Sequence, residues 1–439
     1  MKVLPGAVDV HSHGAFGHDF SDADVEGLKT ILRYERSHGV TSYCPTSMTL
    51  PKEQLLDIFA TAVKAGDDKD QARIVGINME GPFIDPDKKG AHVERHIRKP
   101  DIGFFRECNE KSGRLIKLVT LAPNMEGADE FIEELKDEVK ISIGHTMAGY
   151  DTALAAMKKG ANHVTHLFNA MPPFAHRDPG VVGAAADAEN CMVELICDGI
   201  HIHPSVVRNT FRMFGSERVI LISDSMMATG MDNGTYELGG QEVTMNNRKA
   251  TLANGTIAGS ATNLFDCMKI AMEFGIPEAD AIFAATRNPA KSIGVYDRVG
   301  SLTPGKEADI LLVDDEISND PTMRQIYKNA AVGMKVYIYT VEQALIKAKQ
   351  ASESERNYIL IARSPIVFEK LEKGGVNVGN KITLGPVSQE EGRTLLAQFT
   401  ALNDEEIQAC DYLSEKGKEI VFQNIPSTQA VDWKTVHHK

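Results

Sequence analysis

The sequence lacks the features that mark secreted, membrane-spanning and disulfide-bonded proteins. Its six cysteines are scattered without a C-x-x-C pair, which favours reduced, buried thiols. No apolar run approaches the roughly 18 residues that a membrane span requires, and the first residues contain no apolar signal segment. We therefore expect a cytoplasmic protein without membrane insertion.

Positive charge is also scarce. Lys and Arg number 47 against 61 Asp and Glu, a formal net charge of −14. This balance repels nucleic-acid phosphate, so no nucleic-acid partner is expected, and an anionic ligand would need a local positive pocket. No G-x-G-x-x-G or Walker-type loop follows the first predicted strand, which weakens a nucleotide-binding interpretation. At 439 residues the chain exceeds one hydrophobic core, so a large and a smaller domain are expected.

Eight short apolar runs alternate with helical patterns over residues 1–313. Alternation of this kind indicates a parallel sheet, and a count of eight favours a closed (β/α)₈ TIM-like barrel over an open doubly wound sheet. The predicted strands are Ala7–Val10, Thr41–Pro45, Arg73–Met79, Ile116–Leu121, Lys140–Ile143, His163–Leu167, Cys191–Cys197 and Arg218–Ile222. The helical patterns between them include Asp24–Ser37, Lys52–Lys64, Ala128–Glu138 and Gly149–Lys159.

Histidines and carboxylates gather where these strands end. Twelve of the fourteen histidines lie between His11 and His203, and residues 204–436 contain none. Six of the eight strands lead into a His or an acidic residue, and in a barrel enzyme the active site forms at the carboxyl ends of the strands. The side chains concerned are His11, His13, Glu80, His145, His166, Asn169, Asp198, His201 and Asp224.

Several of these side chains are typical of a metal site. His11 and His13 are two residues apart on a strand, so both project to one face. Alone, each residue has an ordinary explanation as a core histidine, a surface pair or a capping carboxylate. Together, His and carboxylate ligands suit Zn²⁺, Fe²⁺, Mn²⁺ or Co²⁺, and they suffice for one or two ions. Asp224 would face water at the metal and move a proton, as amide or ester hydrolysis requires.

A long series of motifs resembles the N-acetylglucosamine-6-phosphate deacetylases of the amidohydrolase superfamily over about residues 4–313. Such a series is far more specific than any single motif in it. The motifs, in order, are Pro5–Gly14, Met79–Phe83, Lys89–His92, Leu121–Asn124, Gly144–Thr146, Thr165–Met171, Arg177–Gly180, Asp198–His201 and Ser223–Asp224.

This resemblance implies a role for each candidate residue. Glu80, His145 and His166 would hold the principal metal, and His11 and His13, with Asp224, a second ion. Asp224 would be the general base and then the acid, and His201 would stabilise the oxyanion and hold the substrate. The expected contacts to the sugar phosphate are His92, Asn169, Ala170, Arg177 and Ile257. In the family the arginine reaches the site across a dimer interface, so a homodimer is implied.

The chain departs from this family at both ends. The family begins with half of a small β-sandwich, whereas this sequence starts at the first barrel strand. From residue 313 on, the sequence contains the motifs Val313–Glu316, Asp320–Pro321, Arg363–Pro365, Gly374–Val376, Val378–Asn380 and Asn424–Ser427. On these motifs residues 314–439 resemble the IIB subunit of mannose-family phosphotransferase systems, with a mainly parallel α/β sheet expected. Strand-like runs occur at Lys335–Tyr339, Tyr358–Ala362, Lys381–Leu384 and Glu419–Phe422. The phosphoacceptor histidine is missing, so this domain is expected to carry no phosphoryl group.

Three functions are compatible with these features. The leading hypothesis is metal-dependent deacetylation of N-acetylglucosamine 6-phosphate, with N-acetylgalactosamine 6-phosphate as the alternative epimer. Another amidohydrolase acting on a cyclic amide is disfavoured because Arg177 and the Asn169–Ala170 turn suit a phosphate. A non-catalytic sugar-transport fusion protein is disfavoured by the missing histidine. The β-hairpin predicted at Gly234–Lys249 receives no catalytic role.

Overall fold

The computed structural model describes residues 2–313, apart from 69 and 308, together with 358–362, 381–383 and 421–424. The chain divides into two units, one of Gly6–Glu307 and one of Met1–Pro5 with Ala308–Lys439. Among the helices of the described residues, none combines the length and apolar character that a membrane crossing requires.

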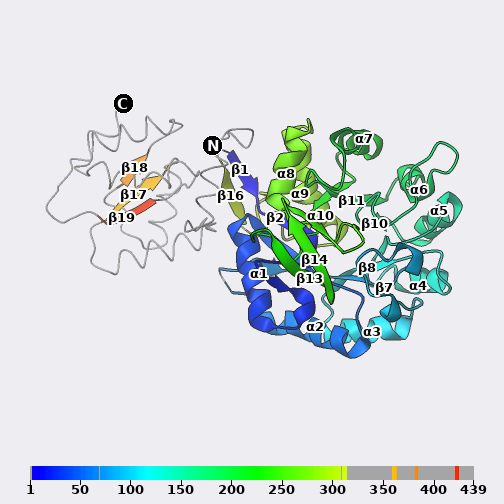
Figure 1. The fold of residues 1–439 in the computed structure, drawn as a ribbon. Coiled ribbons are helices and arrows are strands. Elements are labelled where there is room, and N and C mark those ends of the chain that lie inside the picture. Colours follow the sequence, from blue (N-terminus) through cyan, green and yellow to red (C-terminus); the bar gives the residue numbers. More distant parts are fainter. Residues whose placement is uncertain are drawn as a thin grey trace. The chain divides into compact units, whose positions relative to one another are not determined.

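Eight parallel strands of the first unit form a nearly closed barrel, as predicted (Figure 1). They pair in the order in which they occur in the chain, and a short strand, β6 (Arg73–Ile74), adds to β5. The barrel strands are β2 (Ala7–Ser12), β5 (Val40–Ser47), β7 (Ile77–Phe83), β8 (Ile116–Leu121), β9 (Lys140–Ile143), β10 (His163–Val164), β11 (Met192–Ile196) and β12 (Val219–Ile222).

Backbone hydrogen bonds beyond the strands bring β12 to β2 and so complete the ring. The N–H of Asp224 donates to the carbonyl of His11 at 2.9 Å, and the N–H of His13 donates to the carbonyl of Ser225 at 2.8 Å. These bonds join the first and last strands at their carboxyl ends. The barrel is therefore closed at the point where the candidate metal residues of both strands lie.

Helices alternate with the barrel strands and lie around them (Figure 1). Asp24 starts the first helix by accepting hydrogen bonds from the N–H groups of Glu26 and Gly27. The helices are α1 (Val25–Ser37), α2 (Lys52–Ala65), α3 (Ile102–Lys111), α4 (Ala128–Leu135), α5 (Tyr150–Lys159), α6 (Gly180–Asp187), α7 (Pro204–Phe214), α8 (Leu264–Glu273), α9 (Glu278–Ala285) and α10 (Arg287–Ser292). The four helices predicted between strands are all confirmed within a few residues at their ends.

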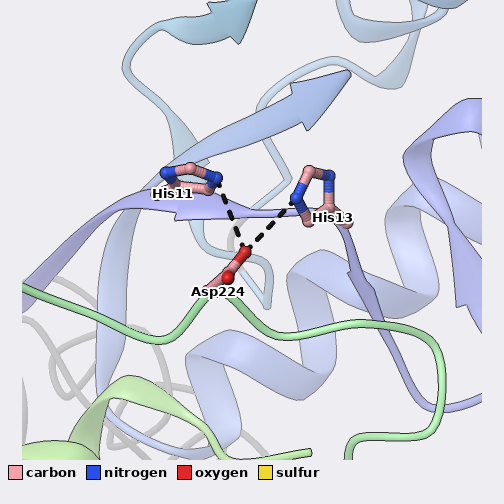
Figure 2. Close-up of side chains that lie close together, drawn as sticks. All are labelled: His11, His13 and Asp224. Atoms are coloured by element: carbon pink, nitrogen blue, oxygen red, sulfur yellow. Dashed lines mark ion pairs between the residues drawn. The ribbon is translucent and has the colours of Figure 1, made fainter. Parts of the chain in front are cut away.

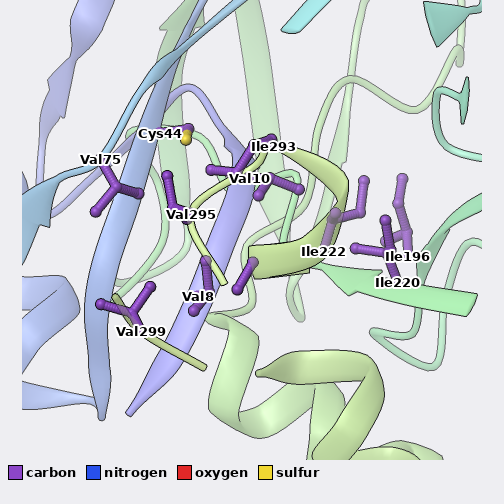
Figure 3. Close-up of a cluster of buried hydrophobic side chains, with 11 residues drawn as sticks. Val8, Val10, Cys44, Val75, Ile196, Ile220, Ile222, Ile293, Val295 and Val299 are labelled. Atoms are coloured by element: carbon purple, nitrogen blue, oxygen red, sulfur yellow. The ribbon is translucent and has the colours of Figure 1, made fainter. Parts of the chain in front are cut away.

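A cluster of buried apolar side chains supports the seam between β2 and β12 (Figure 3). Val8 and Val10 from β2 and Ile220 and Ile222 from β12 belong to it. Cys44, Val75, Ile196 and Ala290 also belong to it, as do Ile293, Val295 and Val299 after α10. Val10 immediately precedes His11, so this packing fixes the strand that carries the two histidines.

Smaller sheets complete the described structure. The predicted hairpin is confirmed as β13 (Gly234–Leu238) and β14 (Gln241–Asn246), with β15 (Lys249–Thr251) as a third antiparallel strand. Two further short strands, β3 (Gly14–Ala15) and β4 (His18–Asp19), pair with each other. All five cysteines among the described residues are free and buried, as expected.

The second unit contains two small sheets within the described residues. In one, β1 (Lys2–Pro5) pairs antiparallel with β16 (Ile310–Val313). In the other, β17 (Tyr358–Ala362) pairs parallel with β18 (Lys381–Thr383) and antiparallel with β19 (Val421–Asn424). The strand predicted at 335–339 lies outside the described residues.

Candidate metal centre

Glu80 is the centre of the candidate site. It is buried on β7, and five imidazole rings direct their Nε2 atoms at its carboxylate. The distances from Glu80 oxygens are 3.0 Å to His166, 3.2 Å to His145 and His13, 3.3 Å to His92 and 3.4 Å to His11. The structure thus brings the predicted ligands from four strands together at one point.

Asp224 lies beside this cluster on the chain that follows β12 (Figure 2). His11 and His13 project from the same side of β2, and their Nε2 atoms lie 3.5 Å and 3.3 Å from Oδ1 of Asp224. The prediction that both histidines of the H-x-H pair project to one face is therefore confirmed. The three side chains form one group whose ligand atoms lie within 4.8 Å of one another.

Three of the predicted ligands have strained backbones. His145, His166 and Asp224 have φ angles of 44°, 26° and 47°, in the left-handed region that residues with a Cβ rarely occupy. Each of them is the second residue after its strand, β9, β10 or β12. This turn also ends β10 at Val164, so the strand predicted over His163–Leu167 is shorter than expected.

The ring orientations of three histidines are fixed by bonds at Nδ1. His11 Nδ1 lies 2.9 Å from a Glu194 oxygen, His13 Nδ1 lies 3.2 Å from the carbonyl of Thr46, and His145 Nδ1 lies 2.8 Å from the carbonyl of Lys88. Because these partners are acceptors, each Nδ1 carries the proton. Each Nε2 is therefore the ring nitrogen that would bind a metal, once the cation displaces any proton that it carries toward the carboxylates.

His92 has the opposite tautomer. Its Nδ1 accepts a hydrogen bond from the N–H of Thr49 at 3.0 Å. Burial lowers the pKa of His92 to about 4, so the ring is neutral and its Nε2 carries the proton toward Glu80. His92 lies close enough to Glu80 and His145 to be grouped with them. A proton on Nε2 makes it a hydrogen-bond donor rather than a metal ligand.

The charges of the site favour bound cations. The pKa of His13 is raised to about 10, because hydrogen bonds to Asp224 and Glu80 outweigh the opposing effect of burial. The pKa of Glu80 is held well below its ordinary value; burial alone would raise it, but His11 and the neighbouring imidazoles outweigh burial. Imidazole protons thus balance the buried carboxylates in the protein alone, and a divalent cation would take their place.

The residues fit a divalent metal. His11 Nε2 is completely buried and has no hydrogen-bond partner among the described residues. The converging nitrogen and oxygen atoms lie 3.0–3.5 Å apart. Ligands about 2.1 Å from one ion would be separated by roughly the same distance, about 3–3.4 Å. Four imidazoles and two carboxylates without a thiolate suit Zn²⁺, Fe²⁺, Mn²⁺ or Co²⁺.

The other predicted residues lie around this centre to different degrees. Asp198 holds His201, whose Nδ1 donates to its carboxylate at 2.7 Å. Burial would raise the pKa of Asp198, but the hydrogen bond and charge of His201 outweigh it and lower the pKa. Ile257 belongs to the segment that reaches Ser260, whose N–H donates to the carbonyl of Asp224 at 2.7 Å.

The segment after β10 carries the remaining predicted contacts. The carbonyl of Ala170 accepts a hydrogen bond from the N–H of Thr146 at 3.1 Å, next to His145. Asn169 donates its side-chain amide to the carbonyl of His166 at 3.3 Å. Arg177 is exposed, so the structure does not bring it into the buried cluster.

Glu194 is a buried residue of the site that the sequence analysis missed. It lies on β11, and its oxygen Oε2 contacts both His11 and the N–H of His166. The available signal was its position as a single acid within the apolar run Met192–Ile196, where a charge requires a partner.

Comparisons with known proteins divide the chain into two families. Residues 2–341 match the amidohydrolase family, and residues 304–439 match the sorbose-subfamily IIB component of the phosphotransferase system. The first match agrees with the barrel. The second agrees with the resemblance of the C-terminal region to a phosphotransferase IIB subunit.

Individual relatives match the barrel region. An N-acetylglucosamine-6-phosphate deacetylase of Bacillus subtilis (strain 168) is 40% identical over 320 residues, which are 72% of this chain and 81% of the relative. An N-acetylgalactosamine-6-phosphate deacetylase of Escherichia coli O157:H7 is 34% identical over 71% of this chain and 83% of its own. A Mycobacterium smegmatis deacetylase, solved with N-acetyl-D-glucosamine-6-phosphate, has a TM-score of 0.68 and 34% identity over 72% of this chain and 84% of its own.

Proposed function

Because the chain belongs to the amidohydrolase family, we propose that its barrel hydrolyses N-acetylglucosamine 6-phosphate to glucosamine 6-phosphate and acetate. The observation that carries this proposal is the convergence of Glu80, four ligand histidines and Asp224 in a barrel like that of the named deacetylases. The enzyme is then a hydrolase acting on a carbon–nitrogen bond of an amide.

We place the principal metal on Glu80, His145 and His166, and a second ion on His11, His13 and Asp224. Glu80 contacts imidazoles of both groups, so its carboxylate would be available to an ion held by either. A divalent ion bound here acidifies water and polarises an amide carbonyl, which is the chemistry that hydrolysis of an N-acetyl group requires. The donor set fits Zn, Fe, Mn or Co equally.

Asp224 is placed to move the proton. The pKa of Asp224 is lowered; burial would raise it, but the His11 charge and the hydrogen bond to His13 outweigh burial. An ionised carboxylate at this position accepts a proton from the attacking water. It then returns the proton to the departing amine, as a general base and general acid in turn.

Neighbouring residues would bind and orient the amino sugar. His201, held by Asp198, presents its Nε2 for the oxyanion that develops on the acetyl carbonyl. His92, whose Nε2 donor lies beside Glu80, is the proposed contact to the sugar. The turn at Asn169 and Ala170 and the segment at Ile257 lie on strand-end chains next to His145 and Asp224.

Arg177 is assigned to the phosphate of the substrate. A phosphate dianion needs a positive partner in a chain of net charge −14, and guanidinium forms paired hydrogen bonds with phosphate. Because Arg177 is exposed, we assign it to the site of the partner subunit in a homodimer. The free, buried thiols support a reducing, cytoplasmic setting for the protein.

The C-terminal region is proposed to accompany the enzyme without phosphoryl transfer. We place the boundary between residues 1–313 and 314–439, inside the overlap of the two family matches. Residues 204–436 contain no histidine that could accept a phosphoryl group. The sequence relation to an N-acetylgalactosamine-6-phosphate deacetylase favours N-acetylgalactosamine 6-phosphate as the second candidate substrate.

The decisive experiment supplies the full-length protein with a divalent metal and N-acetylglucosamine 6-phosphate and measures free amine. Chelator-sensitive amine release is expected. Faster amine release from N-acetylgalactosamine 6-phosphate would make that epimer, rather than N-acetylglucosamine 6-phosphate, the proposed substrate. A metal-loaded protein that is inactive on both would contradict the deacetylase proposal, and activity on a cyclic amide would then identify a different amidohydrolase.

A further inference from the structure

Glu194 occupies an unusual position beneath the metal centre. The side chain is completely buried on β11, between Val193 and Leu195. A carboxylate so deeply buried is strongly unfavourable unless hydrogen bonds compensate for the lost water. Both donors that it has within the described structure belong to predicted metal ligands, which ties this carboxylate to the site rather than to the surrounding core.

The first donor is the ring of His11. Its Nδ1 lies 2.9 Å from Oε2 of Glu194. Because an ionised carboxylate only accepts, this contact holds a proton on Nδ1 and makes Nε2, which faces Glu80 and Asp224, the ring nitrogen available to a metal. A carboxylate partner also makes the ring a stronger ligand.

The second donor is the backbone of His166. Its N–H lies 3.1 Å from the same Oε2 atom, and the N–H of Leu167 donates to the carbonyl of Glu194 at 2.8 Å. These two bonds hold β11 against the turn in which His166 has its left-handed φ of 26°. The turn directs the His166 ring at Glu80, so Glu194 supports a ligand of the other metal position as well.

The remaining oxygen of Glu194 has no competing donor among the described residues. Oε1 lies 3.9 Å from Nε2 of His163, and neither atom has a hydrogen-bond partner there. His163 bonds through Nδ1 to the hydroxyl of Ser142 at 2.9 Å. Within the described structure, the hydrogen bonds that orient the carboxylate are therefore those with His11 and His166, and the contact with His163 is longer.

We propose that Glu194 is a positioning residue shared by both metal positions, setting the ligand tautomer of His11 and holding the turn of His166. This inference rests on the metal-dependent function proposed above. It predicts that loss of the Glu194 charge weakens the ion bound by His11, His13 and Asp224 most, since there the contact is to the ligand ring itself. The ion bound by Glu80, His145 and His166 should be weakened less.

The test compares Glu194→Gln with Glu35→Gln in the full-length protein. Gln keeps the size and one acceptor oxygen of Glu194 but removes the charge. Glu35, on α1, is equally buried, and neither of its oxygens has a hydrogen-bond partner within the described structure, so it is a matched control. Metal-free samples are titrated with Co²⁺ while visible absorption and the number of bound ions are measured.

For Glu194→Gln we expect roughly 10- to 100-fold weaker binding at one metal position and a changed Co²⁺ absorption spectrum. Glu35→Gln should bind Co²⁺ as the wild type does, and metal-free Glu194→Gln should unfold close to the temperature of the metal-free wild type. Unchanged affinities and spectrum in Glu194→Gln would overturn the inference. So would a loss of affinity accompanied by a matching loss of metal-free stability, since that indicates a purely structural residue.

Amine release is measured on the same samples to separate the two proposals. A wild type that binds Co²⁺ and loses affinity on Glu194→Gln substitution, but deacetylates neither sugar phosphate, would contradict the proposed function while supporting the role of Glu194. Active wild-type enzyme with unchanged metal binding in Glu194→Gln would support the function and overturn the positioning role.

Discussion

Replacing Asp224 by Asn tests the proton-transfer step with little structural change. Asn has nearly the same size and keeps a side-chain oxygen toward His11 and His13. The backbone of Asp224 is held independently of the side chain, by its N–H to the carbonyl of His11 at 2.9 Å and by its carbonyl from the N–H of Ser260 at 2.7 Å. The fold around the site should therefore persist.

The expected loss follows from the contacts. An amide cannot accept the proton of water, and general acid–base catalysis contributes about 10²- to 10⁴-fold, or roughly 2.7–5.5 kcal/mol of activation free energy. The substitution should affect metal binding less than it affects kcat. Asp224 contacts two imidazoles, at 3.3 and 3.5 Å, whereas Glu80 contacts five, at 3.0–3.4 Å. The principal ion should stay bound in the Asp224→Asn variant.

The assay measures kcat for amine release and the metal content of the same preparation. We expect kcat to fall at least about 100-fold while at least one ion per chain is retained. Asp232→Asn, an exposed carboxylate outside the cluster, is the control and should keep wild-type kcat. A metal-loaded Asp224→Asn enzyme with more than a tenth of wild-type kcat would refute the assigned acid–base role.

Four further predictions address stability and binding. Chelation should lower the melting temperature of the barrel by about 5–10 °C, since an ion at 100 times its Kd stabilises by about 2.7 kcal/mol; an unchanged calorimetric transition would mean that no ion was bound. Gly259→Ala should destabilise by about 1–2 kcal/mol and lower kcat, because Gly259 has a φ of +64° and a Cβ would lie 3.2 Å from the carbonyl oxygen of Asp224; equal melting temperature and kcat would contradict this. Arg177→Ala should raise KM for the sugar phosphate about 10- to 100-fold with metal content unchanged; an unchanged KM would remove Arg177 from the phosphate site. Burial, with the charge of Asp9, raises the pKa of Glu35, so the folded protein holds a proton on this carboxyl that the unfolded chain releases as pH rises above the ordinary value of 4.5. The stability of the folded protein should therefore fall with rising pH. In Glu35→Gln, which has no such proton, the melting temperature should fall less steeply with pH.

The barrel was predictable because its sequence pattern repeats. Apolar runs of strand length, separated by amphipathic helices, identified all eight strands. The errors lie where tertiary contacts decide the backbone. The run Arg73–Met79 forms part of two strands, β6 and β7, the second of which continues to Phe83 and so contains Glu80. β10 ends early because the turn at His166 enters the left-handed region.

The convergence of the proposed ligands was predictable from strand ends, whereas their supporting contacts were not. H-x-H spacing on a strand specifies the direction of His11 and His13 from local geometry alone. Glu194 and the tautomer of His92 depend on partners far away in sequence, at His11 and Thr49. Glu35 lies in the apolar stripe of α1 with Leu28, Ile31 and Leu32, so its burial follows helical periodicity that the analysis did not apply to charged residues.

The closure of the barrel between β2 and β12 has a consequence for biosynthesis. His11 and Asp224, whose chains join there, are separated by about 200 residues, which a ribosome adds in roughly 10–40 seconds at ordinary elongation rates. Throughout that interval the nascent chain contains His11 and His13 but not Asp224, the third residue of their group. The proposed second metal position would therefore form only after β12 has left the ribosome. Metal binding at this position would then be a late event that reports a finished barrel.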